Sequence, residues 1–323
     1  MRVLVTGAQG CIGSWVVRSL LSRDIDVVIY DLVASTERLE MIAPLEAIQR
    51  AAIETGRIED TDRIKRLVKD GGITHIVHLA AQLMPYCQQN PVAGGMMNVI
   101  GTLNVFEAAR DSGRNVRVVY ASSSAVWGPG EAYEDKPLSE DQPLKPATHY
   151  GVFKQANEGN ARVFYSHNGI SSIGLRPWTV YGVGRDYGLT ADPTIAIKAV
   201  ALGKPFQIRL TGFMDFQYVE DVAETFVRCL LSPVEGAHVF NLMGDVYRME
   251  DFIQLIANVD PEAARLITCA GPQVPVAFRM DGTQLLTNIP GIPKTSLRDG
   301  VEKTLGMFRE LRAAGKLTET LAK

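Results

Sequence analysis

The chain of 323 residues is 46% hydrophobic and 21% charged, with a formal net charge of -3. This composition is typical of a folded globular protein and excludes a disordered or fibrous one. Because 33 basic side chains are outnumbered by 36 acidic ones, the chain lacks the positive charge that attracts nucleic acids or anionic membranes. We expect neither as a partner.

The short apolar run Val3–Val5 is ended by Thr6 and Gly7, which is unlike a signal peptide, and no apolar run is long enough to span a membrane. We therefore expect a cytoplasmic protein. The cysteines are scattered without a CxxC pair, which favours reduced thiols. His75 and His78 have an odd spacing that points their rings to opposite faces of a strand, so no metal site is expected.

Short β-branched runs alternate with amphipathic helical stretches through the first two thirds of the chain. The predicted strands are residues 3–5, 27–30, 73–79, 116–121 and 171–176. Nearly continuous apolar strands suit a parallel sheet that is buried on both faces. Apolar residues spaced three and four apart, such as Ile12, Val16 and Leu20, mark the helices between them. This alternation predicts an α/β fold with a Rossmann doubly wound parallel sheet.

After Tyr181 the alternation weakens, and glycines and prolines become frequent. We place a smaller, mixed C-terminal substrate lobe there. A helix at 221–231 and a strand at 239–242 are expected to return to the main sheet. The predicted Rossmann domain therefore comprises residues 1–182 plus 212–243, interleaved with a substrate-binding lobe of 183–211 plus 244–323.

Gly7, Gly10 and Gly13 follow the first predicted strand as GxxGxxG, where strand turns into helix. Gly7 permits the tight turn, Gly10 lets the backbone approach a pyrophosphate, and Gly13 lets helix pack on strand. The first amides of the helix, at Cys11 and Ile12, then point at the anion. The trio alone equally describes a tight turn, so a second signal is needed.

Asp31 provides that signal, because it lies 24 positions after Gly7 at the end of the second predicted strand. A carboxylate there can accept hydrogen bonds from both hydroxyls of an adenosine ribose. The same charge repels a 2′-phosphate, so we expect NAD rather than NADP as the cofactor.

Tyr150 and Lys154 lie four residues apart in a predicted helix and so share one face. A nearby cation favours the phenolate and lowers the tyrosine pKa from about 10. Such a phenolate can take the proton of a substrate hydroxyl while the carbon gives hydride to a nicotinamide. By itself the same pair describes a solvated helix edge, so this prediction depends on the dinucleotide site.

Five segments in chain order carry a family resemblance. They are Thr6 with the glycine trio, the residues 78–81 (His, Leu, Ala, Ala), 98–102 (Asn, Val, Ile, Gly, Thr), 122–128 and 150–154. Over nearly the whole chain they resemble the extended short-chain dehydrogenase/reductases, and more narrowly the NAD-dependent epimerase/dehydratase family.

The resemblance implies that Tyr150 is the catalytic acid or base, Lys154 its activator, and Ser123 the hydroxyl that steadies the substrate. It also implies a homodimer formed by the helices around Asn98 and Tyr150. The cofactor contacts that it implies include Leu79, Ala80, Ala81 and Asn98.

Two other chemistries are disfavoured near Ser123. No His and acid partner stands in a strand-turn-helix elbow, so a serine hydrolase is unsupported. Ser124 and Ala125 occupy the positions at which dehydratases of the family carry an Asp and a Glu, so dehydration is disfavoured. Ser124 is instead expected to line the substrate pocket.

Two departures from the family pattern bear on the substrate. Nucleotide-sugar epimerases that resemble this chain usually carry a basic residue at the position of Met214. They carry a further Arg in the C-terminal lobe, which Arg279 could replace only in part. Because these cations grip the diphosphate, we expect a substrate without a nucleotide.

Another departure concerns the cofactor, because Arg57 stands where the family commonly has an Asp that accepts the adenine amino group. A guanidinium cannot accept that hydrogen bond but can stack on the adenine face. It could also support NADP. We expect Arg57 and Ile58 in the cofactor site.

The segment 176–185 matches the part of the family that passes the nicotinamide. We expect Pro177 and Thr179 near the carboxamide. Arg185 is expected in the substrate pocket, where it could pair with a carboxylate or phosphate, although it equally fits a solvated loop charge.

These observations predict an NAD-dependent oxidoreductase that transfers hydride from a secondary hydroxyl of a sugar, sugar acid or polyol-like substrate. One alternative is a nucleotide-sugar (UDP-sugar) 4-epimerase with tightly held NAD. Another is an NAD-sensing, non-catalytic scaffold. The presence of Ser123, Tyr150 and Lys154 disfavours it.

Overall fold

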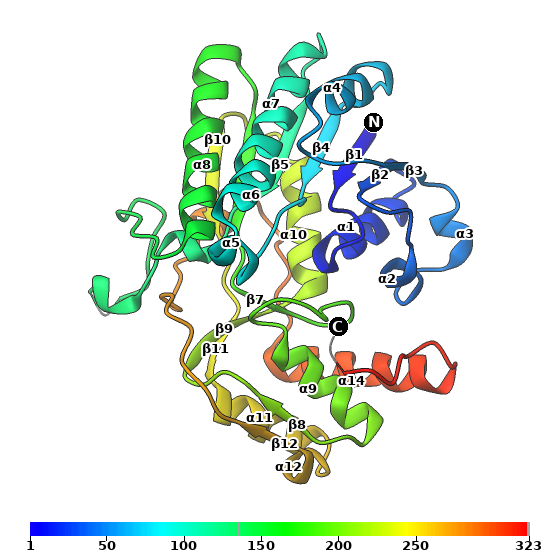
Figure 1. Ribbon diagram of the computed structural model, residues 1–323, viewed down its shortest axis with the longest axis vertical. Helices are drawn as coiled ribbons and strands as arrows, with labels where there is room; N and C mark the ends of the chain where they lie inside the picture. Colours follow the sequence, from blue (N-terminus) through cyan, green and yellow to red (C-terminus); the bar gives the residue numbers. More distant parts are fainter. Residues whose placement is uncertain (135, 322–323) are drawn as a thin grey trace.

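The structure is a computed structural model that describes residues 1–134 and 136–321. Within these residues, parallel strands form a sheet of seven in the order β10-β6-β5-β4-β1-β2-β3 (Figure 1). The strands are β1 (Arg2–Thr6), β2 (Asp26–Asp31), β3 (Ala52–Thr55), β4 (His75–His78), β5 (Arg117–Ala121), β6 (Ser172–Arg176) and β10 (Ala237–Asn241). This is the strand order of a doubly wound fold with one strand added at the edge, and the predicted α/β Rossmann architecture is confirmed.

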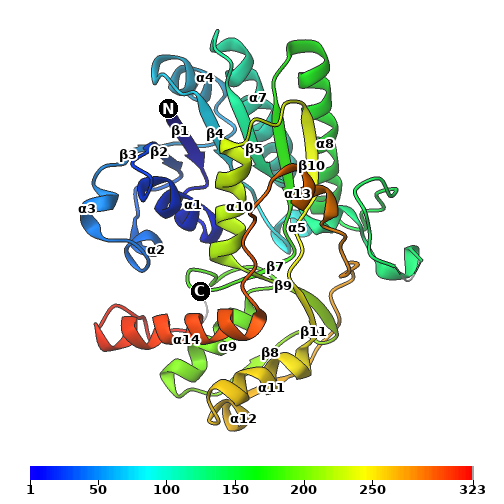
Figure 2. The ribbon, with the colours of Figure 1, turned by 180° about the vertical axis from the view of Figure 1, so that it is seen from behind.

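Both faces of the sheet are buried because successive apolar side chains of each strand point to opposite sides. Val3 and Val5 pack in the larger apolar core, whereas Leu4 between them packs in the second one. The larger core is covered by α1 (Cys11–Leu21) and α10 (Val219–Leu231), with α10 in front of the sheet in Figure 2. The second core is covered by α4 (Thr61–Asp70), α7 (Gly101–Asp111) and α8 (His149–Asn168).

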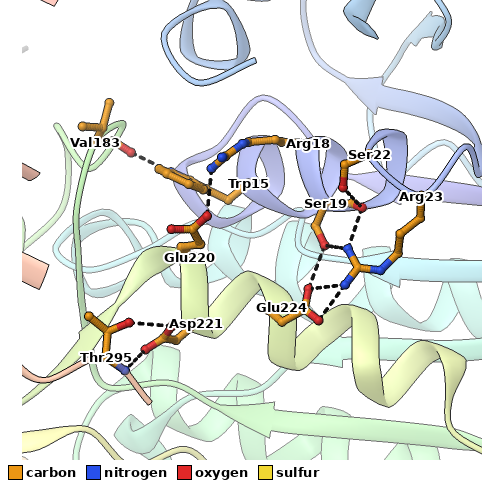
Figure 3. A network of polar contacts seen from close by, with 10 residues as sticks. All are labelled: Trp15, Arg18, Ser19, Ser22, Arg23, Val183, Glu220, Asp221, Glu224 and Thr295. Carbon is orange, nitrogen blue, oxygen red and sulfur yellow. Dashed lines mark hydrogen bonds and ion pairs between the residues drawn. The ribbon is translucent and has the colours of Figure 1, made fainter. Parts of the chain in front are cut away.

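Polar contacts tie α1 to α10, which are far apart in sequence (Figure 3). Arg18 pairs with Glu220 at 3.0 Å, and Arg23 donates two hydrogen bonds to Glu224 at 2.7 and 2.8 Å. The indole of Trp15 donates to the carbonyl of Val183 at 2.9 Å. The same face of α1 thereby reaches both the returning helix and the loop that leads into the second lobe.

Short helices connect these elements. They are α2 (Glu37–Glu40), α3 (Leu45–Ile48), α5 (Tyr86–Gln89), α6 (Pro91–Gly95), the π-helix η1 (Met96–Ile100), and the 3-10 helices η2 (Ser124–Val126) and η3 (Gly130–Ala132). In the part of the chain that is described, no helix is long and apolar enough to cross a membrane.

The smaller lobe lies below the carboxyl edge of the main sheet in Figure 1. Its mixed sheet joins β7 (Thr179–Tyr181), β9 (Phe213–Tyr218) and β11 (Asp245–Arg248), and β8 (Phe206–Ile208) pairs with β12 (Ile267–Cys269). Its helices are α9 (Asp192–Leu202), α11 (Met249–Val259), α12 (Ala263–Leu266) and α14 (Leu297–Ala313), whereas α13 (Thr283–Asn288) lies beside β10 of the main sheet (Figure 2). The predicted mixed lobe is thus present, and the domain limits themselves stay a prediction.

Candidate active site

The glycine turn after β1 is a cradle that a larger residue would fill. Gly7 has a φ of +67°, and a Cβ there would lie 2.6 Å from the backbone nitrogen of Ala80. A Cβ on Gly13 would lie 2.2 Å from the carbonyl oxygen of Gly7. No side chain caps the N-terminus of α1 at Gly10, so the amides that follow, at Cys11 and Ile12, are suited to an anion.

Asp31 ends β2 beside this turn. Its Oδ2 accepts a hydrogen bond from the backbone of Gln9 at 2.9 Å, and its Oδ1 accepts one from Leu32 at 2.8 Å. These bonds fix the carboxylate and leave lone pairs for ribose hydroxyls. A cavity of about 390 Å³ opens there. Of the predicted cofactor residues, its lining includes Gly7, Gly10, Asp31, Ile58, Leu79, Ala80 and Ala81.

Glu59, rather than Arg57, provides the polar side chain at the adenosine end of this cavity. The guanidinium of Arg57 is 67% exposed and pairs with Glu59 Oε1 at 2.7 Å, and Arg57 is not part of the cavity wall. Glu59 does line it, and its Oε2 is buried without a hydrogen-bond partner. This acceptor is of the kind that an adenine amino group needs. The stacking role expected of Arg57 stays a prediction.

Tyr150 and Lys154 lie in the first turns of α8, whose N-terminus is capped by Thr148. The Lys154 Nζ lies 5.6 Å from the centre of the Tyr150 ring and donates to the carbonyl of Ala121 at 2.7 Å. Lys154 is buried, and this burial lowers its pKa to about 8. The face shared by the two residues is therefore turned toward the end of β5.

Burial raises the pKa of Tyr150 to about 12, although a hydrogen bond with Ser123 and the charge of Arg185 lower it. This direction differs from the expectation that a neighbouring ammonium would bring the tyrosine pKa down. The physical reason is that removal of the phenol from water outweighs the hydrogen bond with Ser123 and the charge of Arg185.

Ser123 is held directly after β5 with its side chain toward Tyr150. Its Oγ accepts a hydrogen bond from the backbone of Ala125 at 3.1 Å. Ser122 instead donates to Glu158 at 2.5 Å, in a buried cluster in which Glu158 also pairs with Arg176 at 2.8 Å. Of these neighbouring serines, Ser123 is thus the one aimed at the tyrosine.

A second cavity of about 220 Å³ brings together the residues predicted for the substrate. Ser123, Ser124, Tyr150 and Arg185 all line it. The remaining wall is mostly apolar: Leu83, Met84, Ala125, Thr148, Trp178, Leu189, Thr190, Val274, Pro275 and Val276. Residues from the Rossmann sheet and from the smaller lobe therefore form one pocket.

Asn98 lies behind the pair Tyr150 and Lys154 rather than in the cavity wall. It is buried in the π-helix η1, and its amide donates to the carbonyls of Gln82 and Gly94 at 3.1 and 2.9 Å. Its own carbonyl accepts a hydrogen bond from Asn157 of α8 at 2.9 Å. Asn98 thus fixes η1 against α8.

His78 is part of the same buried layer. Its ring lies between the hydroxyls of Thr6 and Thr102, at 2.7 and 3.0 Å. Burial and the charge of Lys154 lower its pKa to about 3. The ring is therefore neutral, and it adds no second positive charge beside Lys154.

Two of the expected contacts lie apart from both cavities. Thr179 is buried in β7, where its hydroxyl faces the sulfur of Met214 at 3.7 Å. Pro177 is not part of either cavity wall, but its carbonyl accepts a hydrogen bond from the backbone of Ser124 at 3.0 Å, and Ser124 does line the substrate cavity. Arg279 lines a separate cavity of about 430 Å³ together with Lys136 and two glutamates, Glu131 and Glu134.

Sequence reasoning missed Gln9, Glu59 and Arg38. Arg38 donates to the carbonyl of Gln9 at 2.9 Å and to that of Gly184 at 3.1 Å, so it joins the glycine turn to the loop before Arg185. Glu59 stands two positions after Arg57 and could have been found as the next acceptor along that segment. Nothing in the sequence marks Arg38, because its contacts depend on tertiary structure.

Comparisons with known proteins agree with this geometry. Residues 3–242 match the NAD dependent epimerase/dehydratase family. A UDP-glucose 4-epimerase of Mycolicibacterium smegmatis is 30% identical, with 96% of this chain and 99% of that protein covered. An uncharacterized protein of Methanocaldococcus jannaschii is 34% identical over 79% of each chain. The solved UDP-glucose 4-epimerase of Thermus thermophilus in complex with NAD is 26% identical, with a TM-score of 0.79 and 96% and 99% coverage.

The fold and the Tyr, Lys and Ser arrangement define an NAD-dependent enzyme of the extended short-chain dehydrogenase/reductase type. The chain belongs to the NAD-dependent epimerase/dehydratase family. The predicted cofactor, NAD, is confirmed by this membership, and the uncapped helix, the glycine cradle and the unpaired Glu59 oxygen fit it.

Proposed function

We propose that this enzyme oxidises a secondary hydroxyl of a carbohydrate substrate, with Tyr150 as the proton acceptor. The observation that carries the proposal is the meeting of Tyr150, Ser123 and Arg185 in one pocket, with Lys154 behind the tyrosine. NAD, when bound, supplies the acceptor for the hydride of the same carbon. Cytoplasmic location and a homodimer stay part of the proposal.

The cofactor would be held along the carboxyl edge of β1, β2 and β4. The first amides of α1, including Cys11 and Ile12, would receive the pyrophosphate, and Asp31 would accept the ribose hydroxyls. Glu59 would accept the adenine amino group through its unpaired Oε2. Leu79, Ala80 and Ala81 line the same cavity and would cover the dinucleotide.

Ser123 and Lys154 prepare Tyr150 for proton transfer. Because Ser123 Oγ already accepts the Ala125 amide, its own proton is left for the phenol oxygen or the substrate oxygen. Lys154 is fixed by the carbonyl of Ala121 and keeps its ammonium near the tyrosine ring. Tyr150 can accept a proton only as the phenolate, which its raised pKa makes scarce at neutral pH and which the charges of Arg185 and Lys154 favour. The hydroxyl proton of the substrate would pass to this phenolate oxygen as the carbon is oxidised.

Two net reactions share this half-reaction. In a dehydrogenase the ketone leaves, whereas in a 4-epimerase it receives hydride back on its other face. The comparisons favour the second over an unspecified sugar or polyol, because relatives that span nearly the whole chain are UDP-glucose 4-epimerases.

One feature of this chain disfavours a substrate that carries a nucleotide. Met214, at the position of a family cation, is completely buried, whereas Arg279 lines a neighbouring cavity that shares Val274–Val276 with the cavity at Tyr150. A diphosphate in the expected place would therefore lack a cation at position 214. This supports a substrate without a nucleotide and leaves the net reaction open.

The two reactions are separated by incubating the enzyme and NAD with sugars, aldonic and uronic acids, polyols and UDP-sugars. NADH absorbance that grows with product supports a dehydrogenase, and inverted product without net NADH supports an epimerase. If none of these substrates is oxidised or inverted, the proposal is contradicted and the non-catalytic scaffold is favoured.

A further inference from the structure

The only charged side chain among the described residues of the substrate cavity is Arg185. The wall around it is formed largely by Leu83, Met84 and the segment Val274–Val276. A guanidinium in such a wall loses water, which is unfavourable unless an anion replaces it. The cavity is therefore built with a charge that its own wall does not neutralise.

The hydrogen bonds of Arg185 leave most of its donors available. Its guanidinium donates to the hydroxyl of Thr190 at 3.2 Å, and its Nε is buried without a partner. No ion pair involves Arg185 within residues 1–134 and 136–321. Since a guanidinium has five N–H donors in a planar fork, a planar two-oxygen acceptor would satisfy it best.

The acid next to Arg185 in sequence is occupied elsewhere. Asp186 pairs with Arg38 at 2.6 Å, and Arg38 also donates to the carbonyl of Gly184 at 3.1 Å. Arg38 therefore contacts both neighbours of Arg185, the backbone of Gly184 and the carboxylate of Asp186, and Asp186 is not part of the cavity wall. This leaves Arg185 positioned before any substrate arrives.

We propose that the substrate carries a carboxylate on the sugar unit that is oxidised, and that Arg185 binds this carboxylate while Tyr150 and Ser123 face the reacting hydroxyl. The inference rests on the proposed function and narrows its substrate to a sugar acid. The acid can be free or can be the sugar of a nucleotide, and the recognition of the carboxylate is the same in both.

Binding is tested first, by calorimetry on the full chain saturated with NADH, so that turnover is not needed. Matched pairs differ only in the carboxylate: glucuronate and galacturonate against glucose and galactose, four- to six-carbon aldonates against their polyols, and UDP-glucuronate against UDP-glucose. We expect the acid of at least one pair to bind at least about tenfold more tightly than its neutral partner, as for a charged hydrogen bond.

Arg185→Gln is expected to weaken binding of that acid at least about tenfold and to leave its neutral partner unchanged. Arg66→Gln, which removes the same charge from an exposed position on α4, is the matched control and should leave both unchanged. NADH affinity, measured by fluorescence titration, should change less than about twofold in either variant.

Three results would overturn the inference. The first is that, in every pair, the neutral partner binds as tightly as the acid. The second is that a sugar phosphate binds and no acid does. The third is a loss of NADH affinity in Arg185→Gln, because Arg185 would then serve the pyrophosphate. If a neutral sugar reduces NAD and this activity is lost in Tyr150→Phe, the proposed function stands even where the carboxylate inference fails. If an acid binds as expected but is never turned over, the carboxylate inference stands and the proposed function is contradicted.

Discussion

Tyr150 is the residue on which the proposed chemistry depends most directly. Tyr150→Phe removes the proton acceptor but keeps the ring beside Lys154, so we expect kcat to fall by about 10² to 10⁴. The affinity for NADH should stay within about twofold, as measured by fluorescence titration. Ser296→Ala, which removes the helix cap of α14 outside the substrate cavity, is the comparison for indirect effects of lost stability. Unchanged turnover in Tyr150→Phe would contradict the role of Tyr150 as the proton acceptor.

The buried ammonium of Lys154 gives the protein a pH-dependent stability. Its pKa is about 8 in the folded state, against an ordinary value of 10.5 for a lysine in the unfolded chain, so between these values the unfolded chain binds more protons. Stability therefore rises with pH from about 8, up to the alkaline range in which tyrosines and thiols with raised pKa begin to oppose it.

Lys154→Met should remove this contribution. Between pH 8 and 9.5, urea unfolding should show a free energy of unfolding that rises more steeply with pH in the wild type, by up to about 1.4 kcal/mol per pH unit. The comparison at equal pH cancels the groups common to both proteins. Equal slopes would show that Lys154 keeps its ordinary pKa.

Asp31 is expected to decide between the two nicotinamide cofactors. We expect kcat/KM to favour NAD over NADP at least tenfold, because the carboxylate repels a 2′-phosphate. Asp31→Asn should narrow that preference, mainly through weaker NAD binding, while Arg57→Gln should change it little since that side chain lies outside the cavity. A tenfold preference for NADP in the wild type would refute this interpretation.

At this scale the sequence predicted the residues that local spacing places. Tyr150 and Lys154 follow from helix geometry, and Gly7 and Asp31 from the strand-to-helix turn. Arg38 could not be predicted in the same way, because its role depends on the carbonyls of Gln9 and Gly184, which lie close to it only in the fold. Glu59 was within reach of the sequence argument as the next acceptor after Arg57, but which of the two side chains lines the cavity is decided by the fold.

Among the elements, α8 comes unusually close to η2. A Cβ on Gly151 would lie 2.3 Å from the carbonyl oxygen of Ala125. Gly151→Ala should therefore push the start of α8 away from Ser123, lower kcat and destabilise the fold by about 1–3 kcal/mol.

Gly159 provides the control on the same helix. A Cβ there would meet only the flexible end of Arg162, at 3.9 Å. Gly159→Ala should stabilise the protein by about 0.5–1 kcal/mol through helix propensity, with unchanged kcat. Thermal unfolding and steady-state kinetics on both variants separate helix propensity from the contact with η2.

The predicted strands were those with long apolar runs, and this explains the one that was missed in the main sheet. β3 is an edge strand, and Ile53 is 40% exposed, so its sequence shows neither a buried run nor clear alternation. Thr179–Tyr181 was recognised as a functional segment but not as a strand, because β7 has only three residues and its partner β9 comes much later in the chain.

For the molecule as a whole, the arrangement of α6, η1 and α8 supports the expected homodimer. Val92, Met96, Val152 and Val163 are exposed on these neighbouring helices, with Val92 at 81%. Val152 and Val163 lie eleven residues apart on α8 and therefore on one face. Clustered exposed apolar side chains of this kind favour association.

We expect light scattering after gel filtration to give twice the chain mass of 35.3 kDa. Val163→Glu should shift the protein toward the monomer, because a carboxylate buried across a two-fold interface would face its own copy. Leu45→Glu, at a residue that is 55% exposed on the distant helix α3, is the matched control and should leave the dimer unchanged. A monomeric wild type at micromolar concentration would contradict the dimer, and dissociation by both variants would place the interface elsewhere.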